Sequence, residues 1–183
     1  NAGGALADYN WSELSQAKWD VRRMLENLGN DIQCSVFSIA EMQYTGNGPV
    51  QKKNAKGLLK TDAGNKVTGC KLAYYAVQNV TAVFDNTLER IKDASYTHSL
   101  AEGDGNRYWI STDRSIAVYG YRHRETKKRG YTIWKDDAIP GDDCEMTFLD
   151  FAFAGGGFED PVLVDMITGG VYEIPAAQWS REG

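Results

Sequence analysis

The sequence predicts a chain of two parts, an α/β segment followed by an all-β segment. Apolar residues recur at three- and four-residue steps over residues 14–28 and 72–91, which is the period of an amphipathic helix. Between them, residues 34–40 form a short apolar run typical of a strand buried on both faces. Beyond residue 106 the period becomes two, which indicates antiparallel strands with one buried face.

The composition bounds the class of protein. With 183 residues, 42% hydrophobic and 25% charged, the chain has the values of an ordinary globular protein of one or two domains. A net charge of −5 argues against a nucleic-acid-binding surface. The basic stretch 122–129 contains Glu125 and precedes Gly130, which favours a solvated hairpin end. No apolar run approaches the ~18 residues that span a membrane, so we expect no membrane span.

Cysteine and histidine usage argues against a metal site. The three cysteines are widely spaced and form no CxxC pair, so neither a disulfide framework nor a zinc site is indicated. His98 and His123 have no ligand-like neighbours, which disfavours histidine-ligated metal and Ser/His/Asp chemistry. A group of acidic residues lacks EF-hand spacing and is typical of a solvated loop: Asp136, Asp137, Asp142 and Asp143. We therefore expect no metal and no cofactor.

The first helix has recognisable ends. Asn10 with Glu13 three residues later predicts a capping box at its start, and Gly29 stands where a C-terminal cap belongs. A turn at residues 30–31 leads into the apolar run 34–40. Helix, short turn and buried strand together form half of a repeating α/β unit.

The second helix follows a loop region. Residues 45–54 are rich in turn formers, and a short apolar patch at 57–60 precedes a polar turn at 62–65. The predicted helix then presents one apolar stripe: Leu72, Tyr75, Ala76, Val80, Val83, Phe84, Leu88 and Ile91.

The second part is predicted to be a small antiparallel β-sandwich. Residues 95–106 are polar and Gly-rich and are interpreted as the linker between the two parts. The expected strands are a hairpin of 107–111 with 115–121, single strands at 131–135 and 145–153, and a hairpin of 162–166 with 171–174.

Ionisable and polar residues begin where the apolar run 34–40 ends. Functional groups gather at the carboxyl ends of strands in parallel α/β architectures, so Glu41 is the first candidate for a catalytic residue. Gln43, Tyr44 and Asn47 follow as candidate hydrogen-bonding neighbours. The alternatives are that Glu41 pairs with a loop lysine, Lys52 or Lys53, and that the three neighbours are ordinary loop residues.

The helix 16–28, the segment SVFSIAEMQY and the closing PVLVDMITGGVYEIP together resemble a known family. The chain looks like the C-terminal part of a retaining (β/α)₈-barrel glycoside hydrolase with an appended β-sandwich. The resemblance implies that residues 1–94 are the last barrel units, 95–106 the linker and 107–183 the sandwich. It also implies that Glu41 is the nucleophile and that the substrate is a carbohydrate.

A retaining glycosidase uses two carboxyl groups about 5 to 5.5 Å apart. In the family, the acid/base glutamate lies on an earlier strand, for which this chain has no counterpart. The resemblance therefore implies a glycosidase fragment that is inactive alone and needs the remainder of the barrel as its partner. It also favours a secreted or periplasmic protein.

A non-catalytic module is the alternative. The β-sandwich would then bind a glycan through Trp109, Trp134 or Tyr121, or it would only brace a barrel. Aromatic side chains at alternating strand positions are also typical of a hydrophobic core.

Overall fold

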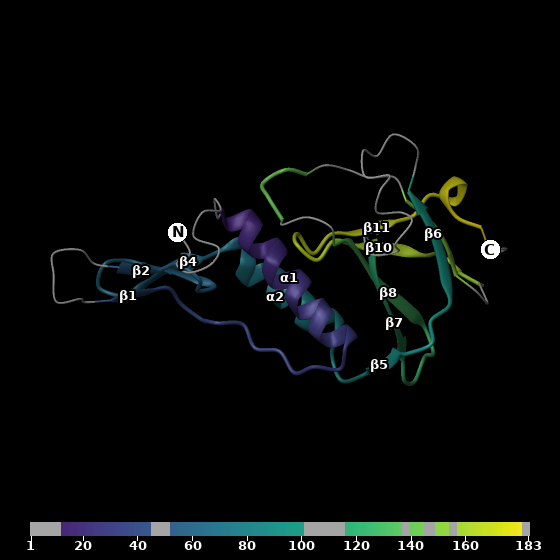
Figure 1. Cartoon of the computed structure of the whole chain (residues 1–183), viewed down its shortest axis with the longest axis horizontal. Coiled ribbons are helices and arrows are strands. Elements are labelled where there is room, and N and C mark those ends of the chain that lie inside the picture. The colour runs from purple at the N-terminus through teal and green to yellow at the C-terminus, as the bar shows by residue number, and fades with distance from the viewer. Residues whose placement is uncertain are drawn as a thin grey trace. The chain divides into compact units, whose positions relative to one another are not determined.

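The structure, a computed structural model, divides the chain into two compact units, and its fold is mixed α/β and mainly β (Figure 1). The described residues are 12–44, 52–100, 116–136, 140–144, 149–153 and 157–180. Unit 1 comprises residues 1–83, 140–142 and 166–169; unit 2 comprises residues 84–139, 143–165 and 170–183. The sheets within the described ranges are small and antiparallel, and they form no barrel.

Two helices pack against each other in unit 1, α1 (Glu13–Gly29) and α2 (Leu72–Val83) (Figure 1). Ser12 caps α1: its Oγ accepts a hydrogen bond from the Ser15 N–H, and the Ser15 Oγ accepts one from the Ser12 N–H. The predicted cap Asn10 lies outside the described residues. The buried apolar residues of the two helices are Ala17, Val21 and Leu25 in α1 and Ala73, Ala76 and Val80 in α2.

The prediction that α2 continues to Ile91 is wrong. The helix ends at Val83, and Leu88–Ile91 forms strand β5 of unit 2. The Asp85 carboxylate accepts hydrogen bonds from both the N–H and the hydroxyl of Thr87, a local turn that competes with helical bonding. The buried stripe is accordingly shorter than predicted, and Tyr75 is 50% exposed.

The described part of unit 1 also contains two short hairpins. Strand β1 (Met42–Tyr44) pairs with β2 (Lys52–Asn54), and β3 (Leu59–Thr61) pairs with β4 (Val67–Cys70). The predicted polar turn at 62–65 is confirmed as the connection between β3 and β4. The Asp62 carboxylate closes this turn by accepting the N–H groups of Gly64 and Lys66.

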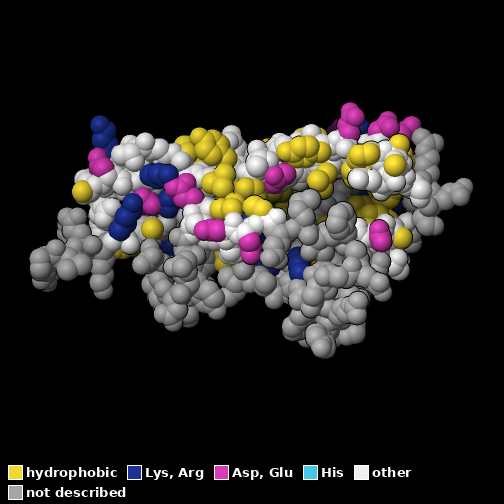
Figure 2. Space-filling model, turned by 90° about the horizontal axis from the view of Figure 1, so that it is seen from above, with side chains coloured by type: hydrophobic (Ala, Val, Ile, Leu, Met, Phe, Trp, Pro, Cys, Tyr) yellow, Lys and Arg dark blue, Asp and Glu magenta, His cyan; other side chains and the backbone are white. Residues whose placement is uncertain are grey.

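The apolar run 34–40 is not the buried strand that its composition predicts. Phe37 is 62% exposed and Ile39 is 65% exposed. Ala40 forms a parallel bridge with Leu59, and the Ser38 and Ile39 carbonyls accept the N–H groups of Leu58 and Leu59. A strand is buried on both faces only where sheet neighbours and helices cover it, and the described residues supply few of these. Hydrophobic side chains lie at the surface elsewhere too, in the patches of Figure 2.

The described residues of unit 2 form three antiparallel sheets. The largest has β7 (Ile116–His123) between β5 and β8 (Arg129–Lys135). The others pair β6 (Tyr96–Leu100) with β9 (Leu149–Phe153), and β10 (Val162–Val164) with β11 (Val171–Glu173). A short 3₁₀ turn, Ala176–Gln178, follows.

Several of the predicted strands of the second part are observed. The hairpin of residues 162–174 and the strand at 131–135 are confirmed, as β10 with β11 and as β8. The strand predicted at 115–121 is β7, which pairs with β5 and β8. Its predicted partner, 107–111, lies outside the described residues, as does 145–148 of the next predicted strand.

The stretch interpreted as a linker contains a strand. Residues 96–100 form β6 and pair with β9. The rings of His98 on β6 and Phe151 on β9 are stacked, with centroids 5.6 Å apart. Tyr96 and Phe153 occupy the neighbouring cross-strand positions on the same face. Aromatic pairing of this kind stabilises a sheet although the intervening residues are polar.

Candidate functional site

Glu41 lies directly before β1 and is anchored through its backbone. Its N–H donates to the Leu59 carbonyl at 2.9 Å, and its own carbonyl accepts the Thr61 hydroxyl at 3.2 Å. The side chain is buried, with 5% exposed. Gly57 permits this packing: a Cβ at that position would lie 2.1 Å from both the Ala40 carbonyl carbon and the Glu41 nitrogen.

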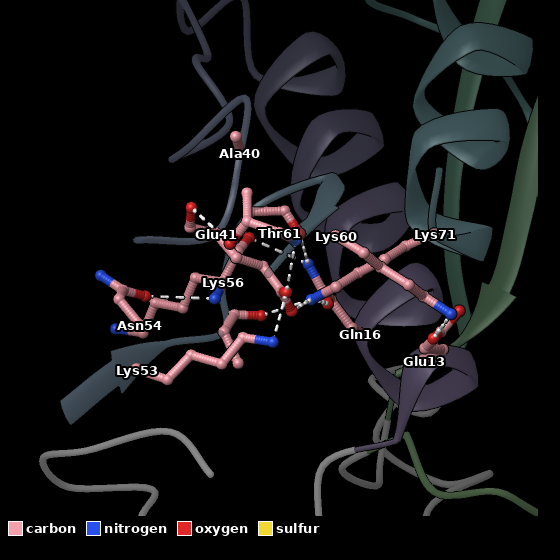
Figure 3. A network of polar contacts seen from close by, with 12 residues as sticks. Glu13, Gln16, Ala40, Glu41, Lys53, Asn54, Lys56, Lys60, Thr61 and Lys71 are labelled. Atoms are coloured by element: carbon pink, nitrogen blue, oxygen red, sulfur yellow. Dashed lines mark hydrogen bonds and ion pairs between the residues drawn. The ribbon is translucent and has the colours of Figure 1, made fainter. Parts of the chain in front are cut away.

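Two ammonium groups surround the Glu41 carboxylate (Figure 3). Lys53 Nζ lies 2.6 Å from Oε2, and Lys71 Nζ lies 2.7 Å from Oε1. The Thr61 N–H also donates to Oε2, at 3.2 Å. Pairing with Lys53, one of the alternatives left open by the sequence, is therefore observed. The structure does not describe the side chain of Lys52.

Lys71 is held in place by further acceptors. Its side chain is 6% exposed, and its ammonium group also donates to the Gln16 side-chain oxygen at 3.2 Å and the Ala55 carbonyl at 2.6 Å. The three donors of the ammonium group thus match three acceptors. Because Lys71 directly precedes α2 and Gln16 lies on α1, the network ties both helices to Glu41.

Lys53 differs from Lys71 in exposure. It lies on β2, and its side chain is 42% exposed. Lys60, on β3, is exposed to the same degree, 44%, but pairs with Glu13 at the start of α1 (Figure 3). The site therefore contains one fixed cation and one cation open to solvent.

The lysines hold Glu41 in its ionised form. Burial of the carboxyl acts to raise its pKa. This effect is outweighed by hydrogen bonds from Lys53, Lys71 and the Thr61 N–H and by the charge of Lys71. The net result lowers the pKa of Glu41 from 4.5 to about 2. Glu41 is a carboxylate throughout the neutral range.

Asp20, on α1, behaves in the opposite way. Burial raises its pKa from 3.8 to about 6, against a hydrogen bond from Gln16 and the nearby charge of Lys71, both of which lower it. A protonated carboxyl donates a hydrogen bond and an ionised one accepts, so Asp20 changes its hydrogen-bonding capacity just below neutral pH.

Gln43 and Tyr44 bond to partners other than the Glu41 carboxylate. The Gln43 N–H donates to the Asn65 side-chain oxygen at 2.7 Å, and the Tyr44 hydroxyl accepts from Asn54 at 3.2 Å. Within the described part of the chain, neither side chain hydrogen-bonds to the Glu41 carboxylate. Asn47 lies outside the described residues.

Three residues that bond to Glu41 or Lys71 were not predicted from the sequence: Lys71, Gln16 and Thr61. The sequence did contain one indication for Lys71: it is a single charged residue between Cys70 and the apolar start of α2. A lysine in such a position is either exposed to solvent or paired with a buried partner. Gln16 and Thr61 carry no comparable signal, because polar residues are common in a first helical turn and at a strand end.

Comparison with family models, with curated proteins and with solved structures finds no match for this chain. Within the described ranges, no three His, Cys, Asp or Glu side chains come together as a metal site. None of the helices in these ranges has the length and apolar character needed to cross a bilayer. The site is thus defined by its own geometry, a buried carboxylate bound by two ammonium groups.

Proposed function

We propose that this chain is part of a retaining glycoside hydrolase in which Glu41 is the nucleophile. One observation carries the proposal: Glu41 is a buried carboxylate kept ionised by Lys53 and Lys71. A carboxylate nucleophile must be anionic and held in one orientation when the substrate arrives. The Lys71 contact and the Thr61 N–H provide that orientation.

The reaction proceeds in two steps. In the first, a Glu41 oxygen bonds to the anomeric carbon, the bond from that carbon to the leaving oxygen breaks, and an acid partner protonates the leaving oxygen. In the second, the same partner removes a proton from water, which displaces Glu41 from the sugar. We place the acid/base carboxyl outside this chain, in the remainder of the barrel. Residues 1–83 of unit 1 are then the end of the barrel, and the strands of unit 2, from β5 onward, belong to an appended sandwich.

A glycosyl donor that needs no acid tests this assignment on the chain as it is. In a fluorosugar with a dinitrophenyl leaving group, the dinitrophenolate departs without protonation. The first step then requires only a nucleophile, which is Glu41. Because the base for the second step is absent, the ester accumulates. Mass spectrometry of the chain after incubation with gluco-, galacto-, manno- and xylo-configured donors is expected to show one adduct, on the peptide that contains Glu41.

Two variants make the labelling experiment specific. Glu41→Gln preserves the shape of the side chain and removes its charge, so it is expected to abolish the adduct. Glu13→Gln removes an exposed carboxylate that pairs with Lys60, and it is expected to leave labelling unchanged. An adduct that forms equally on the Glu41→Gln variant, or no adduct with any of the four donors, would exclude Glu41 as the nucleophile.

Glycan binding by unit 2 is the second candidate function, and the setting of Trp134 favours it. Its ring lies on β8, half-buried, with its centroid 5.7 Å from that of Tyr119, and its indole N–H donates to Asp136 at 3.1 Å. A fixed, partly exposed indole provides an apolar surface with a polar edge. Tyr121 is 4% exposed and offers no such surface. Trp109 lies outside the described residues.

The two candidates predict opposite sensitivities. If unit 2 binds glycans, affinity for immobilised oligosaccharides is lost in Trp134→Ala and retained in Glu41→Gln. If the chain contributes only a nucleophile, Trp134→Ala leaves fluorosugar labelling intact. Measuring binding and labelling on both variants separates the two functions.

A further inference from the structure

The two lysines that contact Glu41 are not equivalent. Lys71 is buried and shares its ammonium group among the Glu41 carboxylate, Gln16 and the Ala55 carbonyl. Lys53 is 42% exposed, and among the described residues Glu41 is its one polar partner. Releasing Lys71 would leave a buried cation without its partners, which is costly. Releasing Lys53 costs less than releasing Lys71, because its side chain is already partly exposed and its ammonium group returns to water.

The two lysines also bind different oxygens. Lys71 binds Oε1, whereas Lys53 and the Thr61 N–H bind Oε2. If Lys53 departs, the carboxylate keeps Lys71 on one oxygen and the Thr61 N–H on the other. The group would therefore stay ionised and oriented, with Oε2 open on the side that Lys53 occupied.

We propose that Lys53 is a displaceable cover of Glu41: its ammonium group occupies the position in front of Oε2 and leaves when a ligand binds there. The ligand presents a group that carries or develops positive charge, because that group takes the place of an ammonium ion beside a carboxylate. Its identity rests on the proposed function, in which a neutral sugar binds and positive charge develops at its anomeric carbon in the oxocarbenium-like transition state. Lys53 thereby controls access to the nucleophilic oxygen.

Access to Oε2 can be measured without any sugar. Trimethyloxonium transfers a methyl group to an ionised carboxylate, forming a methyl ester and releasing dimethyl ether. Peptide mapping by mass spectrometry then gives the rate of esterification at Glu41 at neutral pH. Lys53→Met removes the ammonium group and keeps an unbranched side chain. Lys60→Met is the matched control, because Lys60 is equally exposed and its partner is Glu13.

The Lys53→Met variant is expected to esterify Glu41 at least about fivefold faster than the wild-type chain, because the ammonium group in front of Oε2 is gone. Lys60→Met and Lys53→Arg are expected to react at the wild-type rate, since one leaves the cover in place and the other restores it. Circular dichroism melting of each variant confirms that it is folded. Equal rates for Lys53→Met and Lys60→Met would overturn the proposal.

The outcome is separable from that of the proposed function. If Lys53→Met speeds esterification but no fluorosugar labels any variant, Lys53 covers Glu41 and the glycosidase assignment fails. If fluorosugars label the wild-type and Lys53→Met chains at the same rate, the assignment stands and Lys53 does not restrict ligand access. Faster labelling and faster esterification in Lys53→Met together support both proposals.

Discussion

The Glu41 carboxylate and the Lys71 ammonium group lie 2.7 Å apart, and both side chains are almost fully buried. Two opposite charges removed from water are tolerated only when each has its hydrogen-bonding partners. The Thr61 N–H is a further hydrogen-bonding partner of Glu41, and the oxygens of Gln16 and Ala55 are further partners of Lys71. The pair therefore serves as a structural contact of unit 1 and fixes the orientation of the one candidate nucleophile.

The losses of stability on removing the two members of this pair are expected not to be additive. Lys71→Met leaves a buried carboxylate without one of its two ammonium partners, and we expect a loss of about 3–5 kcal/mol in the free energy of unfolding, measured by urea denaturation. The double variant Glu41→Gln/Lys71→Met, which buries no charge at either position, is expected to lose less than the sum of the two single variants. Strictly additive losses would show that the two groups do not interact.

The pKa of Glu41 predicts sensitivity to acid. It lies at about 2 in the folded chain, below the roughly 4.3 of an unfolded glutamate, so the unfolded state takes up its proton first as the pH falls. The stabilisation is fully present above about pH 5 and is lost as the pH falls towards 2, a total of about 3 kcal/mol. Chemical denaturation from pH 7 to pH 2 is expected to show a steeper decline for the wild-type chain than for Glu41→Gln. Parallel declines would place the acid sensitivity elsewhere.

Asp20 predicts the opposite dependence. Its folded pKa of about 6 exceeds the roughly 3.9 of an unfolded aspartate, so its contribution is present below about pH 4 and is lost as the pH rises through 6. Asp20→Asn is therefore expected to match the wild-type chain near pH 4 and to be more stable at pH 7, by on the order of 1 kcal/mol because the site is partly open to water. Thermal melting at the two pH values measures this. A less stable variant at pH 7 would mean that ionised Asp20 stabilises the fold, for example through Lys71.

The close approach at Gly57 predicts a steric effect on the site. A methyl group there would overlap the backbone between Ala40 and Glu41, so Gly57→Ala is expected to cost at least about 2 kcal/mol and to shift Glu41 away from Lys53 and Lys71. Gly69→Ala is the control, because a Cβ at Gly69 meets no atom within 4 Å. Urea denaturation of both variants, with the esterification rate at Glu41 as a local readout, checks the prediction. Equal stability of the two variants would contradict the packing around Glu41.

Local signals predicted much of the secondary structure. The periodicity of α1, the turn at 62–65 and the hairpin of β10 with β11 depend on neighbouring residues, which the sequence displays directly. Whether residues 34–40 are buried depends on which other segments cover them. Composition cannot distinguish a buried strand from an extended segment with exposed apolar side chains. The end of α2 was missed because the turn at Asp85 and Thr87 interrupts an apolar period that continues into β5.

The site was also predictable only where neighbouring residues in the sequence indicate it. Glu41 stands out as an acid after an apolar run, and a lysine partner was one of two alternatives for it. The contribution of Lys71 could not be predicted, because Lys71 lies 30 positions from Glu41 in the sequence. The backbone of Leu58 and Leu59 bonds to both residues and places them side by side. Long-range contacts of this kind leave no periodic signal.

The most direct test of the account is an NMR titration of the Glu41 side-chain carboxyl carbon, with Glu41→Gln used to assign the signal. We expect an apparent pKa of about 2 in the wild-type chain, a higher value in Lys53→Met, and the wild-type value in Lys60→Met. That result would establish an ionised carboxylate bound by Lys53 and Lys71, as both proposals require. A pKa near the roughly 4.3 of a solvated glutamate, unchanged in Lys53→Met, would contradict the ion-pair site and remove the basis for assigning Glu41 as the nucleophile.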